Sequence, residues 1–197
     1  QLAPKDSEAL HNLAWCWTMF HKFHKAMDLA QQAIAINPND HFAYGVVADS
    51  HFELGQYDQA ADAVQKMVNL RPNLASYSRA AQIRWMMGDA KGASVLWQRA
   101  INAGGPYAEN SAWCRTQLGD TYWKTGAYSA AKQQYEAVLT LIPKYRHAHF
   151  GLGRVLRGEG DFEGAAKEMA QAVEGNPPLT YVIEYAQLLA SMGQKDA

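Results

Sequence analysis

The sequence predicts an all-α fold made of a repeated pair of antiparallel helices, and three observations lead to this prediction. Prolines recur at intervals of 34 residues with one shift after the fourth: Pro4, Pro38, Pro72, Pro106, Pro143 and Pro177. Glycines recur with gaps of 33, 38, 34 and 33 residues: Gly55, Gly88, Gly126, Gly160 and Gly193. Apolar residues between these markers follow the helical spacing. A period of about 34 residues is typical of stacked helical hairpins.

The unit around Gly55 illustrates how each pair is encoded. Residues at i, i+3, i+4 and i+7 predict a first helix from about 41 to 54, and a second helix follows from about 57 to 70. Gly55 ends the first helix because glycine adopts the left-handed conformation at low cost. Pro72 ends the second because proline lacks the backbone donor and disfavours helix in the residue before it.

This unit spans about 41–73, and the other units follow the same order at about 7–40, 74–111, 112–145 and 146–178, with a partial unit at 179–197. In the first unit His21 stands where the glycine is expected. Alanine comes five residues after the later glycines, where a small side chain lets the two helices approach closely: Ala60, Ala93, Ala131 and Ala165. A bulky residue comes nine residues after them and is expected to fill the gap between successive pairs: Val64, Trp97, Tyr135 and Met169. The segment 104–111 is rich in turn formers and is expected to lengthen the link between the third and fourth pairs.

Two of the units carry the same motif almost unchanged. One reads Leu118-Gly119-x-x-Tyr122, Gly126-x-Tyr128-x-x-Ala131 and Pro143. The next reads Leu152-Gly153-x-x-Leu156, Gly160-x-Phe162-x-x-Ala165 and Pro177. This pattern resembles the tetratricopeptide repeat, and the resemblance covers nearly the whole chain as five full units and a partial sixth. It implies a single array over residues 1–197 that coils into a right-handed superhelical solenoid, with the first helices lining its concave face.

The two ends of the sequence and the form of its repeat units indicate what kind of protein it comes from. The chain begins with Gln1 in what resembles the tail of an earlier repeat, and the last unit lacks its second helix. We therefore expect a fragment of a longer protein. The plain repeat units resemble bacterial members of the family.

Positions counted back from each glycine predict which side chains point into the concave groove. The offsets 13, 10, 9, 6, 3 and 2 give the candidate partner-binding residues: Trp15, Phe42, Asp49, Phe52, Arg79, Trp85, Trp113, Asp120, Trp123, Lys124, Phe150, Arg154 and Arg157. Phe52, Trp85 and Trp123 occupy equivalent places, so they form either an aromatic ladder for a ligand or part of the packing between pairs. A groove that mixes aromatic and charged groups suits an extended peptide or an amphipathic helix.

The resemblance also argues against one ligand class. Some family members hold a C-terminal carboxylate with a clamp of lysines, asparagines and an arginine. The corresponding positions here are His11, Trp15, Val46, Ala75 and Arg79, of which only Arg79 matches. An adaptor for chaperone tails is therefore not expected.

Several other function classes find no support in the sequence. A formal charge of −1 argues against nucleic acid, which requires a strongly basic face. No apolar run approaches the roughly 18 residues of a membrane span. The histidines have no cysteine or carboxylate at ligand spacing, so no metal or other cofactor is expected. Catalytic motifs such as G-x-S-x-G or a P-loop are missing, so we expect no enzymatic activity in this segment.

The sequence therefore predicts an interaction scaffold that binds a protein partner in its concave groove. Two alternatives stay open: a self-associating structural module, and the regulatory arm of an enzyme whose catalytic domain lies outside this segment. The chain is expected to be soluble. The sequence does not distinguish the cytoplasm from the periplasm, because any targeting segment would lie outside it.

Overall fold

The computed structural model describes residues 6–105 and 108–193, and all regular secondary structure in these residues is α-helical. Pro4 and Pro106 lie outside the described residues. The helices are α1 (Ser7–Met19), α2 (Phe23–Ile36), α3 (His41–Glu53), α4 (Tyr57–Leu70), α5 (Leu74–Met86), α6 (Ala90–Ala103), α7 (Ala108–Lys124), α8 (Tyr128–Leu141), α9 (Arg146–Glu159), α10 (Phe162–Ala172) and α11 (Leu179–Ser191).

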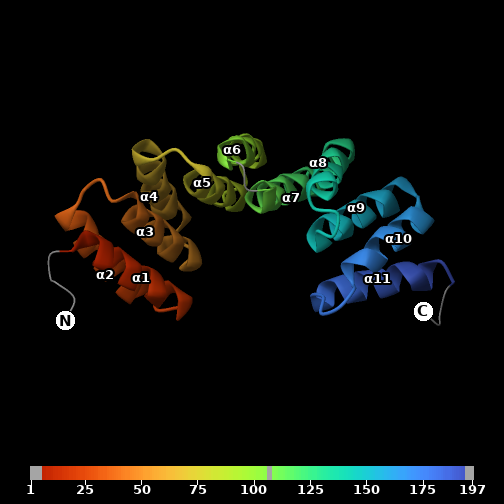
Figure 1. Ribbon diagram of the computed structural model, residues 1–197, viewed down its shortest axis with the longest axis horizontal. Helices are drawn as coiled ribbons and strands as arrows, with labels where there is room; N and C mark the ends of the chain where they lie inside the picture. The colour runs from red at the N-terminus through yellow and green to blue at the C-terminus, as the bar shows by residue number, and fades with distance from the viewer. Residues whose placement is uncertain (1–5, 106–107, 194–197) are drawn as a thin grey trace. The chain divides into compact units, whose positions relative to one another are not determined.

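Consecutive helices form the predicted pairs, which group into two compact units (Figure 1). The first unit, residues 1–104, contains the pairs α1–α2, α3–α4 and α5–α6. The second unit, residues 105–197, contains α7–α8, α9–α10 and α11. Within each unit the first helix of a pair also contacts the first helix of the next pair. Thus α1 contacts α3, and α7 contacts α9. The prediction of an all-α solenoid of antiparallel helical pairs is confirmed.

The turns inside the pairs have the predicted left-handed backbone. Gly55, Gly88, Gly126 and Gly160 have φ angles of 74°, 83°, 80° and 86°. His21 takes the same conformation with a φ of 54°, although a side chain disfavours it. His21 therefore replaces the glycine in geometry as well as in sequence position.

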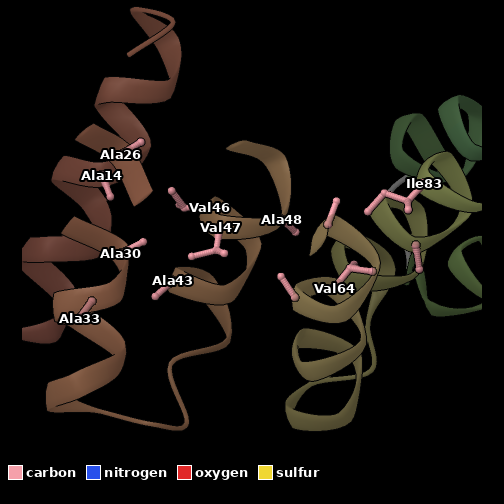
Figure 2. Packing of buried hydrophobic residues seen from close by; sticks show 13 residues of the cluster. Ala14, Ala26, Ala30, Ala33, Ala43, Val46, Val47, Ala48, Val64 and Ile83 are labelled. Atoms are coloured by element: carbon pink, nitrogen blue, oxygen red, sulfur yellow. The ribbon is translucent and has the colours of Figure 1, made fainter. Parts of the chain in front are cut away.

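Small residues form the contacts between the helices. The four alanines that follow the turn glycines by five residues are fully buried, and the bulky residues nine positions after those glycines are at most 4% exposed. Figure 2 shows the same rule in the first unit, where Ala14, Ala26, Ala30 and Ala33 face α3. Because alanine leaves little space between helix axes, these positions tolerate little added volume.

The segment 104–111 differs from its prediction as a longer link. Ala108–Ser111 form the first turn of α7, which has 17 residues where the other first helices have 13 or 14. The additional residues therefore extend a helix. Pro106 and Tyr107 of this segment lie outside the described residues.

Two glycines make room for the ring of Tyr135 in the second unit. A Cβ atom on Gly119 would lie 2.7 Å from Tyr135 Cε1, and one on Gly151 would overlap the same ring more severely. Tyr135 is 1% exposed, so its ring cannot swing into solvent without opening the core. The glycines of α7 and α9 thus allow a large residue of α8 to fill the space between pairs.

We expect Gly151→Ala to destabilise the chain, because the added methyl group overlaps the buried Tyr135 ring. Overpacking of this kind costs about 1–3 kcal/mol. Gly158→Ala is the matched control on the same helix, since a Cβ there meets no atom within 4 Å. It should raise stability by a few tenths of a kcal/mol, up to about 1 kcal/mol. Urea unfolding followed by circular dichroism measures both, and equal midpoints for the two variants would contradict this packing.

Candidate functional site

The residues predicted to face the groove all lie on the first helices of the pairs. Those in the first unit are Trp15 on α1, Phe42, Asp49 and Phe52 on α3, and Arg79 and Trp85 on α5. Those in the second unit are Trp113, Asp120, Trp123 and Lys124 on α7, and Phe150, Arg154 and Arg157 on α9. Each set is described within its own unit.

A cavity of about 260 Å³ lies among the first helices of the first unit. It is lined by His11, Asn12, Trp15, Phe42, Gly45, Val46, Met67, Ala75 and Arg79. The Trp15 and Phe42 side chains are each 53% exposed. At Gly45 a Cβ would lie 3.3 Å from Met67 Sδ and 3.8 Å from Arg79 Nε, so the missing side chain leaves room for two other residues of the lining. The lining includes all five positions that correspond to the carboxylate clamp, but here most of them are apolar.

Asp49 and Arg79, which were predicted to contact a partner, pair with each other. Arg79 donates from Nε to Asp49 Oδ1 at 2.8 Å and from Nη2 to Oδ2 at 3.0 Å. Such a two-point pair between a guanidinium and a carboxylate fixes both groups in one plane. The pair joins α5 to α3 beside the cavity, so a partner would meet a neutral pair there and not two separate charges.

Asp40 holds the histidine at the rim of this cavity. Its carboxylate accepts hydrogen bonds from Ser7 Oγ at 2.5 Å and from the Ala43 amide at 3.0 Å, and it lies 2.8 Å from His11 Nδ1. Burial alone would raise the pKa of Asp40, but these hydrogen bonds and the His11 ring lower it below its usual value. The repeat pattern does not predict this contact, although an aspartate directly before a helix is a common N-cap.

Phe52 and Trp85 are half-buried in the first unit. The Phe52 ring packs against the buried core of α1–α5 and lies 5.7 Å from the Tyr57 ring. For Phe52 this geometry favours the packing alternative over an exposed aromatic ladder.

A polar network connects the first helices of the second unit. Asp120 accepts a hydrogen bond from Tyr135 Oη at 2.7 Å and lies 2.8 Å from His147 Nε2. The other nitrogen of His147 lies 2.9 Å from Tyr181 Oη. Burial alone would raise the pKa of Asp120, but His147, Tyr135 and Lys124 lower it below its usual value. Burial and the nearby Asp120 raise the pKa of both tyrosines.

Arg154 and Arg157 also have partners within the chain. The Arg154 guanidinium lies 3.5 Å from the centre of the Trp123 ring, which is a cation–π contact. Glu184 Oε2 on α11 lies 3.4 Å from Arg154 Nε and 3.6 Å from Arg157 Nη2. Trp123 is therefore partly covered by Arg154, and both arginines face a carboxylate of the next repeat.

Phe150 requires a correction, because it offers no surface to a partner in this structure. It is 5% exposed, and its ring stacks on Tyr181 with centroids 3.8 Å apart and planes at 8°. The offset from Gly160 identified the correct helix but not the tyrosine of the following helix that covers the ring.

The two other predicted residues of the second unit, Trp113 and Lys124 on α7, are exposed.

Two residues of this network were missed, and one of them could have been found. Glu184 lies nine positions before Gly193, which is one of the offsets used for the other units. Counting back from Gly193 in the partial unit, as from the other glycines, therefore predicts Glu184 as a residue of this face. Tyr181 lies twelve positions before that glycine and matches no offset, so its role depends on the three-dimensional contact alone.

No group of three or more His, Cys, Asp or Glu side chains in residues 6–105 and 108–193 is arranged to hold a metal ion. Among the helices of the same residues, none combines the length and apolarity that crossing a membrane requires.

Comparisons with known protein families match the two parts of the chain separately. Residues 116–179 match the family described as Tetratricopeptide repeat. Residues 1–67 match the family described as Anaphase-promoting complex, cyclosome, subunit 3.

Individual proteins also resemble the chain. The BBSome complex member BBS4 of Bos taurus is 24% identical over 181 residues, which are 90% of this chain and 34% of that protein. The chain thus spans about a third of that relative. The structure of Pseudomonas aeruginosa PilF has a TM-score of 0.85 at 14% identity and covers 96% of this chain and 86% of its own. YrrB, described as a TPR protein with an unusual peptide-binding site, has a TM-score of 0.69 at 18% identity and covers 93% of both chains. At these identities the structures establish the fold alone.

We expect the Asp120 carboxylate to make the unfolding free energy depend on pH in the acidic range. Its pKa in the folded chain is below the usual 3.8, so the ionised form stabilises the fold. This contribution is complete above the usual pKa and is lost as the pH falls through the lowered one. Between about pH 5 and pH 3, Asp120→Asn should therefore lose less unfolding free energy than the unmodified chain.

The matched control for this measurement is Asp28→Asn, which removes an exposed carboxylate on α2. Urea unfolding at a series of pH values measures the unfolding free energy. As the pH falls, this variant should lose as much of it as the unmodified chain does. The same slope in all three proteins would contradict the network's role.

Proposed function

Because the chain is built from tetratricopeptide repeats, we propose that it binds a protein partner through an extended peptide or helix lying along its first helices. Proteins of this fold generally mediate protein–protein interactions and are in general non-catalytic scaffolds. The observation that carries the proposal is the cavity of about 260 Å³ in the first unit with Trp15 and Phe42 at its mouth.

The chemistry of this cavity indicates which part of a partner it would bind. Its walls are mostly apolar, and its arginine is already paired with Asp49. A large apolar side chain would fill the cavity and cover the exposed parts of the two rings. Asn12 and His11 at the rim supply polar groups that a peptide backbone requires. That YrrB is described as having a peptide-binding site supports this assignment by analogy of fold.

We expect Trp15→Ala combined with Phe42→Ala to weaken peptide binding at least about tenfold, because covering the exposed halves of the two rings contributes about 2 kcal/mol in total. The probe is a fluorescein-labelled peptide selected on the chain from a random peptide display library, and fluorescence anisotropy measures its affinity.

Tyr128→Ala combined with Phe162→Ala is the control, since it removes two rings of similar exposure from the starts of α8 and α10. This control should retain the affinity within about twofold. Unchanged affinity in a folded Trp15 and Phe42 variant would contradict the proposed site.

Self-association is a second candidate function, and α11 is the observation that favours it. Leu179, Val182 and Ile183 are exposed large apolar side chains on this helix. A group of such residues on one helix is typical of an interaction surface. Two other expectations from the sequence stay predictions. One is that the chain regulates an enzyme outside this segment, and the other is that residues 1–197 form a single array.

If α11 mediates self-association, Ile183→Glu should lower the fraction of oligomer, because a buried carboxylate opposes an apolar contact. Light scattering over a concentration series measures this fraction. Val95→Glu is the control, since Val95 is an exposed apolar residue on α6. A monodisperse monomer at every concentration of the unmodified chain would contradict self-association.

A further inference from the structure

The turn between α1 and α2 differs from the other turns inside the pairs. The later pairs turn at a glycine, whereas this one turns at His21 with a left-handed φ of 54°. A non-glycine residue is disfavoured there, so the sequence keeps a less stable turn than its own pattern provides. Locally unfavourable choices of this kind are expected at functional positions.

A pocket of about 420 Å³ lies against this turn. It is lined by Trp17, His21, Lys22, Phe23, His24, Lys25 and Leu54, and we call it the first-turn pocket. None of these residues lines the groove cavity of the first unit. Trp17, Phe23 and Leu54 give the pocket apolar walls contributed by α1, α2 and the end of α3.

One of the two lysines that line the first-turn pocket lies over its aromatic wall. Lys25 Nζ lies 3.6 Å from the centre of the Trp17 ring, a cation–π contact that holds the ammonium group at the pocket. Lys22 also lines the pocket and is exposed. A ligand in the pocket would therefore meet an aromatic wall and positive charge together.

The side chains that line the pocket carry positive charge, and the nearest carboxylates in the sequence are those of Asp28 and Glu53, outside the lining. Residues 9–27 include two lysines and three histidines but no aspartate or glutamate, in a chain whose formal charge is −1. No carboxylate lines the pocket. Met19 and Phe20, directly before the turn, are 64% and 69% exposed. Exposed apolar groups beside a pocket whose own charged side chains are lysines indicate a surface that meets an anionic, partly apolar partner.

We propose that the first-turn pocket binds an acidic peptide segment that carries a large apolar side chain. The apolar side chain enters between Trp17, Phe23 and Leu54. The flanking carboxylates lie against Lys22 and Lys25. A recess of this volume favours a peptide over an anionic membrane, because apolar side chains of a peptide can enter it whereas a bilayer surface would leave it empty.

The probe is a short fluorescein-labelled peptide with a central Trp-Leu pair flanked by glutamates and aspartates, and fluorescence anisotropy measures its binding. Lys22→Glu with Lys25→Glu should weaken binding at least about tenfold, because the new carboxylates repel those of the peptide. Lys91→Glu with Lys167→Glu makes the same change in net charge on α6 and α10 and should stay within about twofold. Lys22→Glu alone, which leaves the Trp17 contact intact, should give a smaller loss in the same direction.

Two altered peptides separate the charged and apolar contributions without changing the protein. Replacing the acidic residues by their amides, or the Trp-Leu pair by alanines, should each weaken binding severalfold. Trp15→Ala with Phe42→Ala should leave this binding unchanged, so failure here and failure of the groove proposal are distinguishable.

Three results would overturn the proposal. One is that the acidic peptide shows no saturable binding. Another is that both lysine variants lose affinity equally. The third is co-sedimentation with phosphatidylserine vesicles that depends on Lys22 and Lys25 while the peptide fails to bind, which would identify a lipid surface as the partner.

Discussion

The close approach of neighbouring helices through small side chains is the constraint on which the rest of this structure depends. Alanines fill the contacts between helices, and in the second unit Gly119 and Gly151 leave space that the Tyr135 ring occupies. Each pair then needs one large residue, such as Trp97 or Met169, to fill what the small residues leave open. Because a single helical pair cannot bury its apolar faces alone, stability arises from these contacts between successive pairs.

This packing leaves the polar side chains of the first helices to interact one repeat away. Asp49 pairs with Arg79, Asp120 with His147, and Arg154 with Glu184, and in each case one repeat supplies the acid and a neighbouring repeat the base. These groups are half-buried to partly exposed, so each pair contributes modestly to stability. Their larger effect is to fix these side chains on the first helices and to leave few of the opposite charges there unpaired. The surface left for a partner is mostly apolar, with Trp15 and Phe42 as its most exposed rings in the first unit.

The repeat period predicted most of the fold because the features it encodes are local. A left-handed turn, a helix stop and a small residue five positions after the turn depend on the chain within a few residues, so Gly55, Ala60 and the helix at 57–70 were predictable. The period also predicted which helices carry the candidate residues. It did not predict that Phe150 is covered, because Tyr181 lies 31 positions further along the chain and is not required by the repeat pattern. The extension of α7 by Ala108–Ser111 was missed for a related reason, since turn-forming residues are tolerated in the first turn of a helix.

The magnitudes favour an extended partner over a single anchoring residue. Full burial of a large apolar side chain contributes about 1.5–3 kcal/mol, so covering the exposed halves of Trp15 and Phe42 would contribute about 1 kcal/mol each. A micromolar complex requires about 8 kcal/mol after the cost of association has been met. The paired charges beside the cavity add little, because forming a new contact to Arg79 would disrupt its existing one with Asp49. A partner of useful affinity must therefore contact more of the first helices than this one cavity, which a peptide or helix lying along them can do.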